Sequence, residues 1–381
     1  MSSEKESRKA ALSQVKRVVV KVGSGILFSL ESGLDREALS GIVTSVHNLE
    51  TRGFEVVLVS SGAVIAGSSE LGWPERPREI PREQAAAAVG QFYLMRVYQE
   101  LFSPYQTKVA QVLLTHDDLS NRRRYLNAKN TVQELMKNRV LPIINENDTV
   151  VVEELKYGDN DTLAALVTNL VEADLLVLLT DVDGLFDANP KTNPEAALIS
   201  LVENADQAES SIDDNRELVC GKGGMTSKLE AARRTASFGV PTIMANGTVG
   251  GIMEKIVSGE TVGTMFLPAS GKTRLSAWKH WIAHAQKPAG TLKLDAGAGR
   301  ALREGGKSLL PSGILSVSGD FYRGVVVSCV DESGRELARG VVNYHSHEIS
   351  RIRGRKSREI TGILGYKYYD EVIHRNDLVL I

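Results

Sequence analysis

The sequence predicts an α/β protein, in which an αβα sandwich with a mainly parallel sheet is followed by a small C-terminal β-barrel. Three observations lead to this prediction. Short β-branched runs alternate with helical patterns over the first 268 residues, polar motifs follow several of these runs, and the predicted strands become closely spaced after residue 289. Strand–helix alternation with continuous apolar strands is typical of a parallel sheet that is covered on both faces.

The predicted elements of the sandwich follow from their apolar spacing. The first strand is Arg17–Val22, and apolar residues at helical spacing between Asp35 and Gly53 indicate the helix after it. Further strands are predicted at Glu55–Ser60, Val109–Leu114, Val140–Ile144, Asp174–Leu179 and Val240–Met244, and helices at Gln84–Leu101, Leu126–Lys137, Thr162–Val171 and Met225–Ser237.

The length of 381 residues favours two domains over one core. We expect an N-terminal tail at residues 1–14, the main α/β domain at 15–268, a helical connector at 269–288 and the barrel at 289–381. The barrel is predicted because short strands separated by glycine replace the strand–helix alternation there.

Composition excludes some classes of protein and favours one compartment. The net charge of −2 argues against a protein that is wholly nucleic-acid-binding, although residues 289–381 hold 14 Lys and Arg against 11 Asp and Glu. Two cysteines, Cys220 and Cys329, fit a reducing compartment. No signal-peptide pattern or membrane-length apolar run is present, so we expect a cytoplasmic protein without a membrane partner.

Two acidic clusters near the middle of the chain are its most informative motifs. Asn145–Asp148 follows the predicted strand Val140–Ile144, and Gly158–Asp161 opens the predicted helix Thr162–Val171. A helix start needs one capping side chain, so two Asp and one Asn exceed that need. Carboxylates and amides at a strand tip suit a small ligand with an ammonium group.

A glycine-rich segment with lysines is the strongest candidate for phosphate binding. Gly221–Lys228 precedes a predicted helix, and glycines there let backbone N–H groups turn toward an anion. Lys228 adds a charge one turn into that helix, and Lys21 lies at the end of the first strand. Ligands of such sheets bind at the carboxyl ends of the strands, so these motifs are expected to meet.

The motifs, in their order along the chain, resemble those of the amino acid kinase family. Within that family they resemble the members that phosphorylate the side-chain carboxylate of glutamate in the first step of proline biosynthesis. Residues 289–381 resemble a PUA domain, a small barrel otherwise found in RNA-modifying enzymes. The matching segments are Lys21-Val22-Gly23-Ser24, Ser60-Ser61-Gly62-Ala63, Asn145-Glu146-Asn147-Asp148, Gly158-Asp159-Asn160-Asp161, Thr180-Asp181 and Gly223-Gly224-Met225 with Lys228.

The resemblance implies a role for each matching residue. Lys21 and Lys228 would be catalytic and contact the transferring phosphate. Ser61, Asp148 and Asn160 would bind L-glutamate. ATP, the co-substrate, would be bound with Mg²⁺ by Lys21, Thr180, Asp181, Lys222, Gly223, Gly224, Met225, Thr226, Ser227 and Lys228; no residue is assigned to the metal directly.

Two residues depart from the family pattern. Gly25 replaces a hydroxyl residue that often follows Ser24, and Lys222 replaces a threonine that is usual before Gly-Gly-Met. The implied reaction needs no general base, because a glutamate side chain with a pKa of roughly 4.3 is already ionised at neutral pH. Closeness of the reactants and neutralisation of their charge are therefore the main requirements.

Two alternatives stay open at this point. The chain is also compatible with another kinase of the family, acting on acetylglutamate, aspartate, carbamate, uridylate or isopentenyl phosphate, because fold alone does not select the substrate. The second alternative is an RNA-binding or RNA-modifying protein, since residues 351–358 hold five positive charges that could contact phosphates.

The resemblance further implies feedback inhibition by proline and assembly into a homodimer or homotetramer. The proline-containing segment Ser68–Pro81 is predicted to be a loop that covers the substrate or meets a neighbouring subunit.

Overall fold

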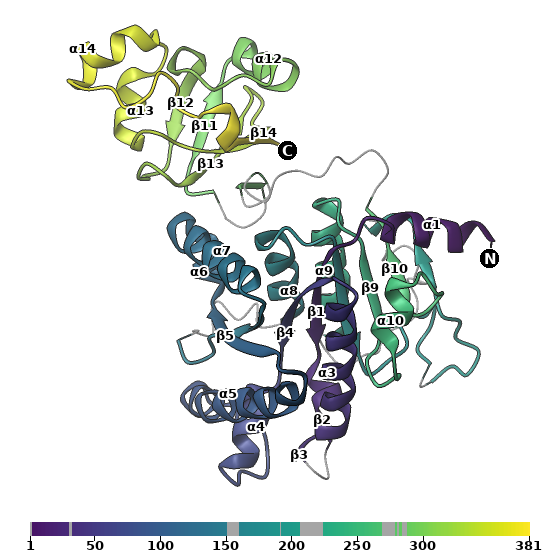
Figure 1. Ribbon diagram of the computed structural model, residues 1–381. Coiled ribbons are helices and arrows are strands. Elements are labelled where there is room, and N and C mark those ends of the chain that lie inside the picture. Colours follow the sequence, from purple (N-terminus) through teal and green to yellow (C-terminus); the bar gives the residue numbers. More distant parts are fainter. Residues whose placement is uncertain are drawn as a thin grey trace. The chain divides into compact units, whose positions relative to one another are not determined.

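The computed structural model describes residues 2–29, 33–150, 160–190, 192–205, 224–268, 279, 282–283 and 288–381 (Figure 1). The chain divides into two compact units, the first comprising residues 1–119 and 125–274 and the second residues 120–124 and 275–381. The connector expected at residues 269–288 lies almost wholly outside the described residues; of its members, 279 and 282–283 are helical.

The first unit is built on an eight-stranded sheet. The strands are β1 (Arg17–Val22), β4 (Glu55–Ser60), β5 (Lys108–Leu114), β6 (Val140–Glu146), β7 (Leu175–Thr180), β8 (Leu201–Val202), β9 (Thr242–Asn246) and β10 (Thr264–Phe266). Their order is β5-β6-β4-β1-β7-β9-β10-β8, and every neighbouring pair is parallel except β9 with β10. The predicted mainly parallel sheet is confirmed, and a short hairpin of β2 (Phe28–Ser29) and β3 (Gly33–Leu34) accompanies it.

Helices cover both faces of this sheet. On one face α3 (Arg36–Thr51), α5 (Ile80–Phe102) and α10 (Ile252–Val257) share a core with Val18, Val20 and Val22 of β1. Because side chains alternate along a strand, Lys21 faces the opposite layer. That layer contains α8 (Asn160–Leu170), which contacts β1, β4, β6 and β7 and packs on α9 (Gly224–Ser237). The remaining helices are α2 (Ser24–Leu27), α4 (Ala63–Glu70), α6 (His116–Ser120), α7 (Arg122–Lys137) and the 3₁₀ turn η1 (Ser103–Tyr105).

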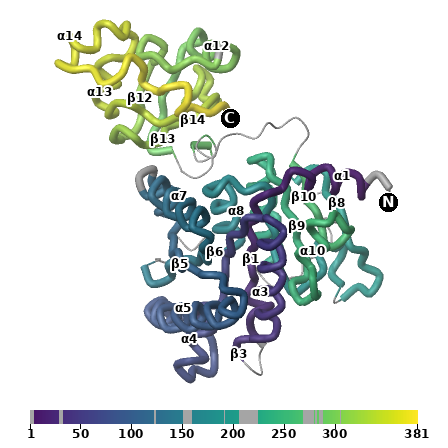
Figure 2. Tube along the Cα trace, in the orientation of Figure 1, coloured from purple at the N-terminus to yellow at the C-terminus, as the bar shows by residue number. Residues whose placement is uncertain are grey.

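The segment that the sequence analysis separates as an N-terminal tail forms helix α1 (Ser2–Leu12) (Figure 2). Its Arg8 side chain is fully buried and donates hydrogen bonds to the backbone carbonyls of Ser200, Glu260, Val262 and Gly263. These carbonyls belong to the segments around β8 and β10. A buried guanidinium needs such acceptors, so Arg8 fastens α1 to this edge of the sheet.

The second unit has its own sheet and its own core. The strands are β11 (Thr291–Leu294), β12 (Ile314–Ser318), β13 (Val326–Val330), β14 (Glu336–Val341) and β15 (Leu378–Leu380), in the order β12-β11-β13-β14-β15 with only β11 and β13 parallel. Its helical segments are α12 (Ala296–Gly305), η4 (Pro311–Gly313), α13 (Ser346–Ile352), η5 (Ser357–Glu359), α14 (Ile360–Leu364) and η6 (Arg375–Asp377).

Candidate active site

The carboxyl ends of the central strands bring the polar motifs together. β1 pairs with β4 on one side and β7 on the other, so Val22 lies opposite Ser60 and Leu179. β6 follows β4 in the sheet, with Val59 opposite Ile144. The segments after these strands start with Gly23, Ser61, Asn147 and Asp181 and therefore share one edge of the sheet.

Lys21 and Lys228 meet at one carboxylate, although 207 positions separate them in the sequence. Lys21 Nζ lies 2.5 Å from Asp161 Oδ1, and Lys228 Nζ lies 3.2 Å from Asp161 Oδ2. The Asp161 side chain is fully buried, and the side chains of Lys21 and Lys228 are 4% and 14% exposed. A buried ammonium group is costly without a partner, and Asp161 provides one for both lysines.

The start of α9 completes this buried cluster. Ser227 Oγ donates to Asp161 Oδ2 at 2.9 Å, and Lys228 Nζ also donates to the Gly224 carbonyl at 2.9 Å. Among the described side chains of this cluster, two ammonium groups face one carboxylate. Positive groups held in a poorly hydrated place attract an anion more strongly than they would in water.

A cavity of about 230 Å³ lies at the same strand ends. Its lining combines acidic, amide and hydroxyl groups with one arginine: Ser24, Ser61, Gly62, Ala63, Val64, Ile65, Arg76, Asn145, Glu146, Asp148 and Asn160. Gly62 has a φ of 100°, and a Cβ there would lie 2.2 Å from Phe28 Cε2, so glycine is needed at this turn. The turn places the N-terminus of α4 at the cavity.

A network of amides joins the walls of the cavity. Asn160 Nδ2 donates to Ser61 Oγ at 2.8 Å, Asn145 Oδ1 at 2.9 Å and the Ser60 carbonyl at 3.0 Å. Behind it, the Ser60 and Tyr98 hydroxyls form a buried hydrogen bond of 2.9 Å. Burial raises the pKa of Tyr98 to about 12, although the bond to Ser60 acts in the opposite direction. Tyr98 is therefore protonated at neutral pH.

Of the described residues predicted to bind the nucleotide, Lys21 lies on β1 and the others lie at the end of β7 and the start of α9. Thr180 ends β7, and its Oγ1 donates to Asp181 Oδ1 at 3.1 Å. A Cβ on Gly25 would meet Asp181 at an ordinary contact distance of 3.4 Å, so Gly25 departs from the family pattern without a steric need. Gly224, Met225, Thr226 and Ser227 form the first turn of α9. Lys222 and Gly223 lie outside the described residues.

Comparison with known proteins decides the family. The model of the amino acid kinase family matches residues 16–246, which is more than half of the chain. The chain belongs to the amino acid kinase family. The PUA domain model matches residues 290–364, in the second unit.

Relatives of about half identity match this chain over nearly its whole length. Proteins named glutamate 5-kinase from Geobacter sulfurreducens and Geobacter metallireducens are 51% and 52% identical to it, over 98% of this chain and 100% of each relative. One from Chromohalobacter salexigens is 49% identical over the full length of both chains. A solved carbamate kinase from Giardia lamblia bound to AMP-PNP has a TM-score of 0.50 at 17% identity, covering 67% of this chain and 99% of that one, and shares the fold.

Asp161 is the site residue to which the sequence analysis gave no role. The sequence held a signal for it, because the second cluster has more acidic and amide side chains than helix capping requires. At the start of α8, the Asn160 side chain contacts the cavity wall at Ser61, and the Asp161 side chain contacts the lysines. Neighbouring helical residues point about 100° apart, so one short segment serves both places. Arg76 and Glu146 also line the cavity without having been selected.

In the part of the chain that the structure describes, no group of three or more His, Cys, Asp or Glu side chains could hold a metal ion. Within the same residues, no helix combines the length and the apolar character needed to cross a membrane.

Proposed function

We propose that this protein transfers the γ-phosphoryl group of ATP to the side-chain carboxylate of L-glutamate, giving L-glutamyl 5-phosphate and ADP. The main support is the buried cluster in which Lys21 and Lys228 share Asp161, at the sheet edge that also holds the 230 Å³ cavity. The relatives named glutamate 5-kinase, at about half identity over the whole chain, support the choice of substrate.

The reaction joins two anions. A glutamate carboxylate oxygen forms a bond to the γ-phosphorus of ATP, and the bond from that phosphorus to the oxygen it shares with the β-phosphate breaks. The leaving oxygen departs with the ADP, so no proton is transferred to or from glutamate. The positive charge of Lys21 and Lys228 stabilises the charge spread over the transferring phosphoryl oxygens. Asp161 holds both ammonium groups in place before the reactants bind.

The cavity would hold glutamate by its amino-acid end. Asp148 and Glu146 provide carboxylates for the α-ammonium group. Ser61 and Asn160 provide hydroxyl and amide groups for the rest of the substrate. In this arrangement Asp148 binds the substrate and does not act as a base.

ATP would occupy the side of the site formed by Thr180, Asp181 and the first turn of α9. A helix N-terminus presents free N–H groups to phosphates, and Lys228 adds a charge to the same turn. We propose that ATP would enter this side of the site as its Mg²⁺ complex, as is usual for nucleotide phosphates. The contribution of Mg²⁺ when bound is to neutralise phosphate charge.

A coupled assay of ADP formation tests the proposed function. We expect ADP release that depends on L-glutamate and far exceeds the release with acetylglutamate, aspartate, carbamate, uridylate or isopentenyl phosphate. A preference for one of the other acceptors would reassign the protein to a sister kinase. ADP release that none of these acceptors stimulates would contradict carboxylate phosphorylation.

Inhibition by proline and assembly into a dimer or tetramer are further proposals that rest on the family resemblance. Adding proline to the same assay tests the first, and light scattering on the purified chain tests the second.

A further inference from the structure

Gln91 is a buried amide of α5 that does not line the cavity, yet it is connected to it by hydrogen bonds. The side chain is on the inner face of the helix, three residues before Leu94 and seven before Tyr98, and Gln91 is 8% exposed. Its Oε1 accepts from Asn145 Nδ2 at 2.8 Å, and its Nε2 donates to Gln111 Oε1 on β5 at 3.2 Å. A buried amide is stable only with such partners.

The amides form a chain in which each one donates to the next. Asn160 donates to Asn145, Asn145 donates to Gln91, and Gln91 donates to Gln111. The direction of the chain is fixed at Asn145, because its Oδ1 also accepts from the Glu146 backbone N–H at 2.9 Å, a group that can only donate. Asn145 must therefore present its NH₂ group to Gln91.

The backbone next to Gln91 is held in place by the neighbouring helix. A Cβ on Gly90 would lie 1.9 Å from the Ala63 carbonyl oxygen and 2.3 Å from the Gly67 nitrogen, so α4 and α5 are in direct backbone contact there. The same crossing brings Gly67 close to the Ala86 carbonyl, which a Cβ would approach to 1.7 Å. Ala63 also lines the cavity. The crossing thus fixes the Gln91 side chain relative to the cavity wall.

Asn160 is the end of the chain that faces the substrate. With its NH₂ group used by Ser61, Asn145 and the Ser60 carbonyl, its Oδ1 is left as an acceptor, and this buried atom has no hydrogen-bond partner among the described residues. Rotation of Asn145 would remove an acceptor from Asn160 and release this orientation. Loss of this orientation would change the hydroxyl and amide groups that Ser61 and Asn160 contribute to the lining of the cavity.

We propose that Gln91 is a positioning residue for the acceptor substrate: it orients Asn145, and through Asn145 it orients Asn160, without contacting glutamate or ATP. This inference rests on the proposed function, because it assigns the affinity for glutamate to the cavity. It predicts that Gln91 controls the KM for glutamate separately from the KM for ATP.

Gln91→Leu removes both hydrogen bonds at nearly constant volume. We expect the KM for L-glutamate to rise about tenfold, as for one lost hydrogen bond to an oriented group, with the KM for ATP within about twofold of the wild-type value. Gln91→Glu keeps an acceptor for Asn145 Nδ2, and the exposed Gln111 amide can turn to donate to it. This variant should return the glutamate KM to within about threefold of wild type.

Tyr98→Phe is the matched control, because it deletes one buried hydrogen bond from the same helix outside the amide chain. It should lower the thermal unfolding midpoint, as expected for one lost buried hydrogen bond, and leave the glutamate KM unchanged. If Gln91→Leu does not fold, Gln91→Asn, which shortens the amide by one methylene, is expected to raise the glutamate KM in its place.

A folded Gln91→Leu variant with an unchanged glutamate KM would overturn the positioning role, and so would an equal rise in both KM values. The wild-type protein is assayed first. Absence of glutamate-dependent ADP formation there would contradict the proposed function, whereas normal wild-type turnover with an unaffected Gln91 variant would contradict only the inference on Gln91.

Discussion

Positive side chains occur in two contrasting settings in this protein. Lys21 is buried and Lys228 is largely shielded from water, and both contact the same carboxylate. The basic segment, residues 351–358, is mostly exposed, and among its contacts Arg351 donates a hydrogen bond to the Ile363 carbonyl. Charges interact strongly where water is excluded and weakly where water and salt screen them. The first setting therefore suits a defined chemical step, whereas the second suits at most a collective, salt-dependent attraction.

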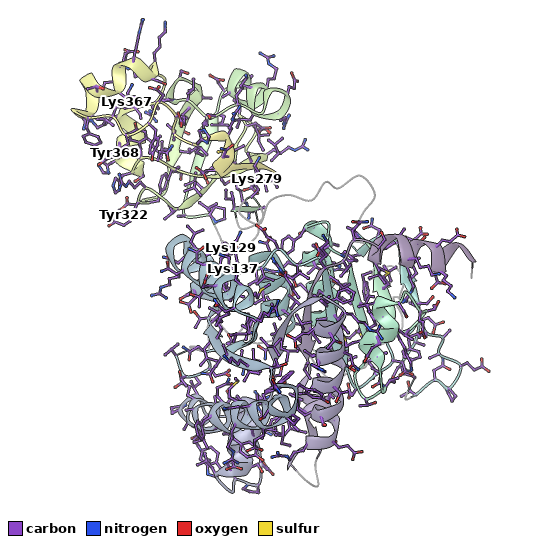
Figure 3. The ribbon with its side chains drawn as sticks, in the orientation of Figure 1. Lys129, Lys137, Lys279, Tyr322, Lys367 and Tyr368 are labelled. Carbon is purple, nitrogen blue, oxygen red and sulfur yellow. The ribbon has the colours of Figure 1, made fainter. Side chains whose placement is uncertain are left out.

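The largest expected effect is in the buried setting. Lys21→Ala and Lys228→Ala should each lower kcat by about 10²–10³-fold, the loss expected for one preorganised charge donor. Steady-state assays of the purified variants measure this. Lys129 of α7 (Figure 3) forms an ion pair with Glu172 at 2.7 Å away from these two lysines. The matched control Lys129→Ala should therefore keep normal turnover. Normal turnover in both site variants would remove the two lysines from the mechanism.

Arg8 is a third buried cation, and its contacts are structural, so it should show the effect of burial on stability without an effect on catalysis. Arg8→Met leaves four carbonyls without their shared donor, so we expect a loss of about 2–3 kcal/mol in the stability of the first unit, measured by urea unfolding. Arg36→Met, which breaks an exposed pair with Glu100, should shift the midpoint much less. Equal shifts in the two variants would contradict the role assigned to Arg8.

Asp148→Asn addresses the substrate end of the site. Losing a charged partner for the α-ammonium group should raise the KM for glutamate roughly 10- to 100-fold, with little change in the KM for ATP. Initial rates over a matrix of both substrate concentrations separate the two constants. An unaltered glutamate KM would exclude this role for Asp148.

The smallest effect is expected in the exposed setting. Replacing Arg353 and Arg355 by Ala should leave kinase turnover and the unfolding midpoint nearly unchanged, as is usual for exposed charges. A gel shift with tRNA over a salt series tests the RNA alternative on the same variant. Binding that weakens steeply with salt and is lost in the double variant would support an electrostatic contact with RNA; binding that ignores salt would exclude it.

The second unit also carries exposed aromatic side chains. In the second unit, Tyr322 and Tyr368 are 74% and 50% exposed, and the Arg323 guanidinium lies 4.6 Å from the Tyr368 ring centre (Figure 3). Lys367 is paired with Asp370 at 2.8 Å, so its positive charge is partly neutralised. RNA binding by the second unit stays a prediction, whereas membership of the amino acid kinase family is established for the chain.

The sequence by itself determined most of the alternating strands and helices of the first unit, its mainly parallel sheet and the position of the polar motifs after strands, but it missed helix α1 and the short strands β8 and β10. This was possible because apolar periodicity and helix-start residues act over a few positions, as at Arg17–Val22 and Asp35. The sequence also led us to expect that Lys21 and Lys228 lie close together in the site. Their catalytic role stays a prediction, as do the roles of Ser61, Asp148 and Asn160 in binding glutamate.

Only the tertiary structure decided how these residues are connected. The sharing of Asp161 by two lysines, the burial of Arg8 and the amide chain from Asn160 to Gln111 each join segments far apart in sequence. No local pattern records such pairs, because the free energy of a buried polar group depends on which neighbour the folded chain places beside it.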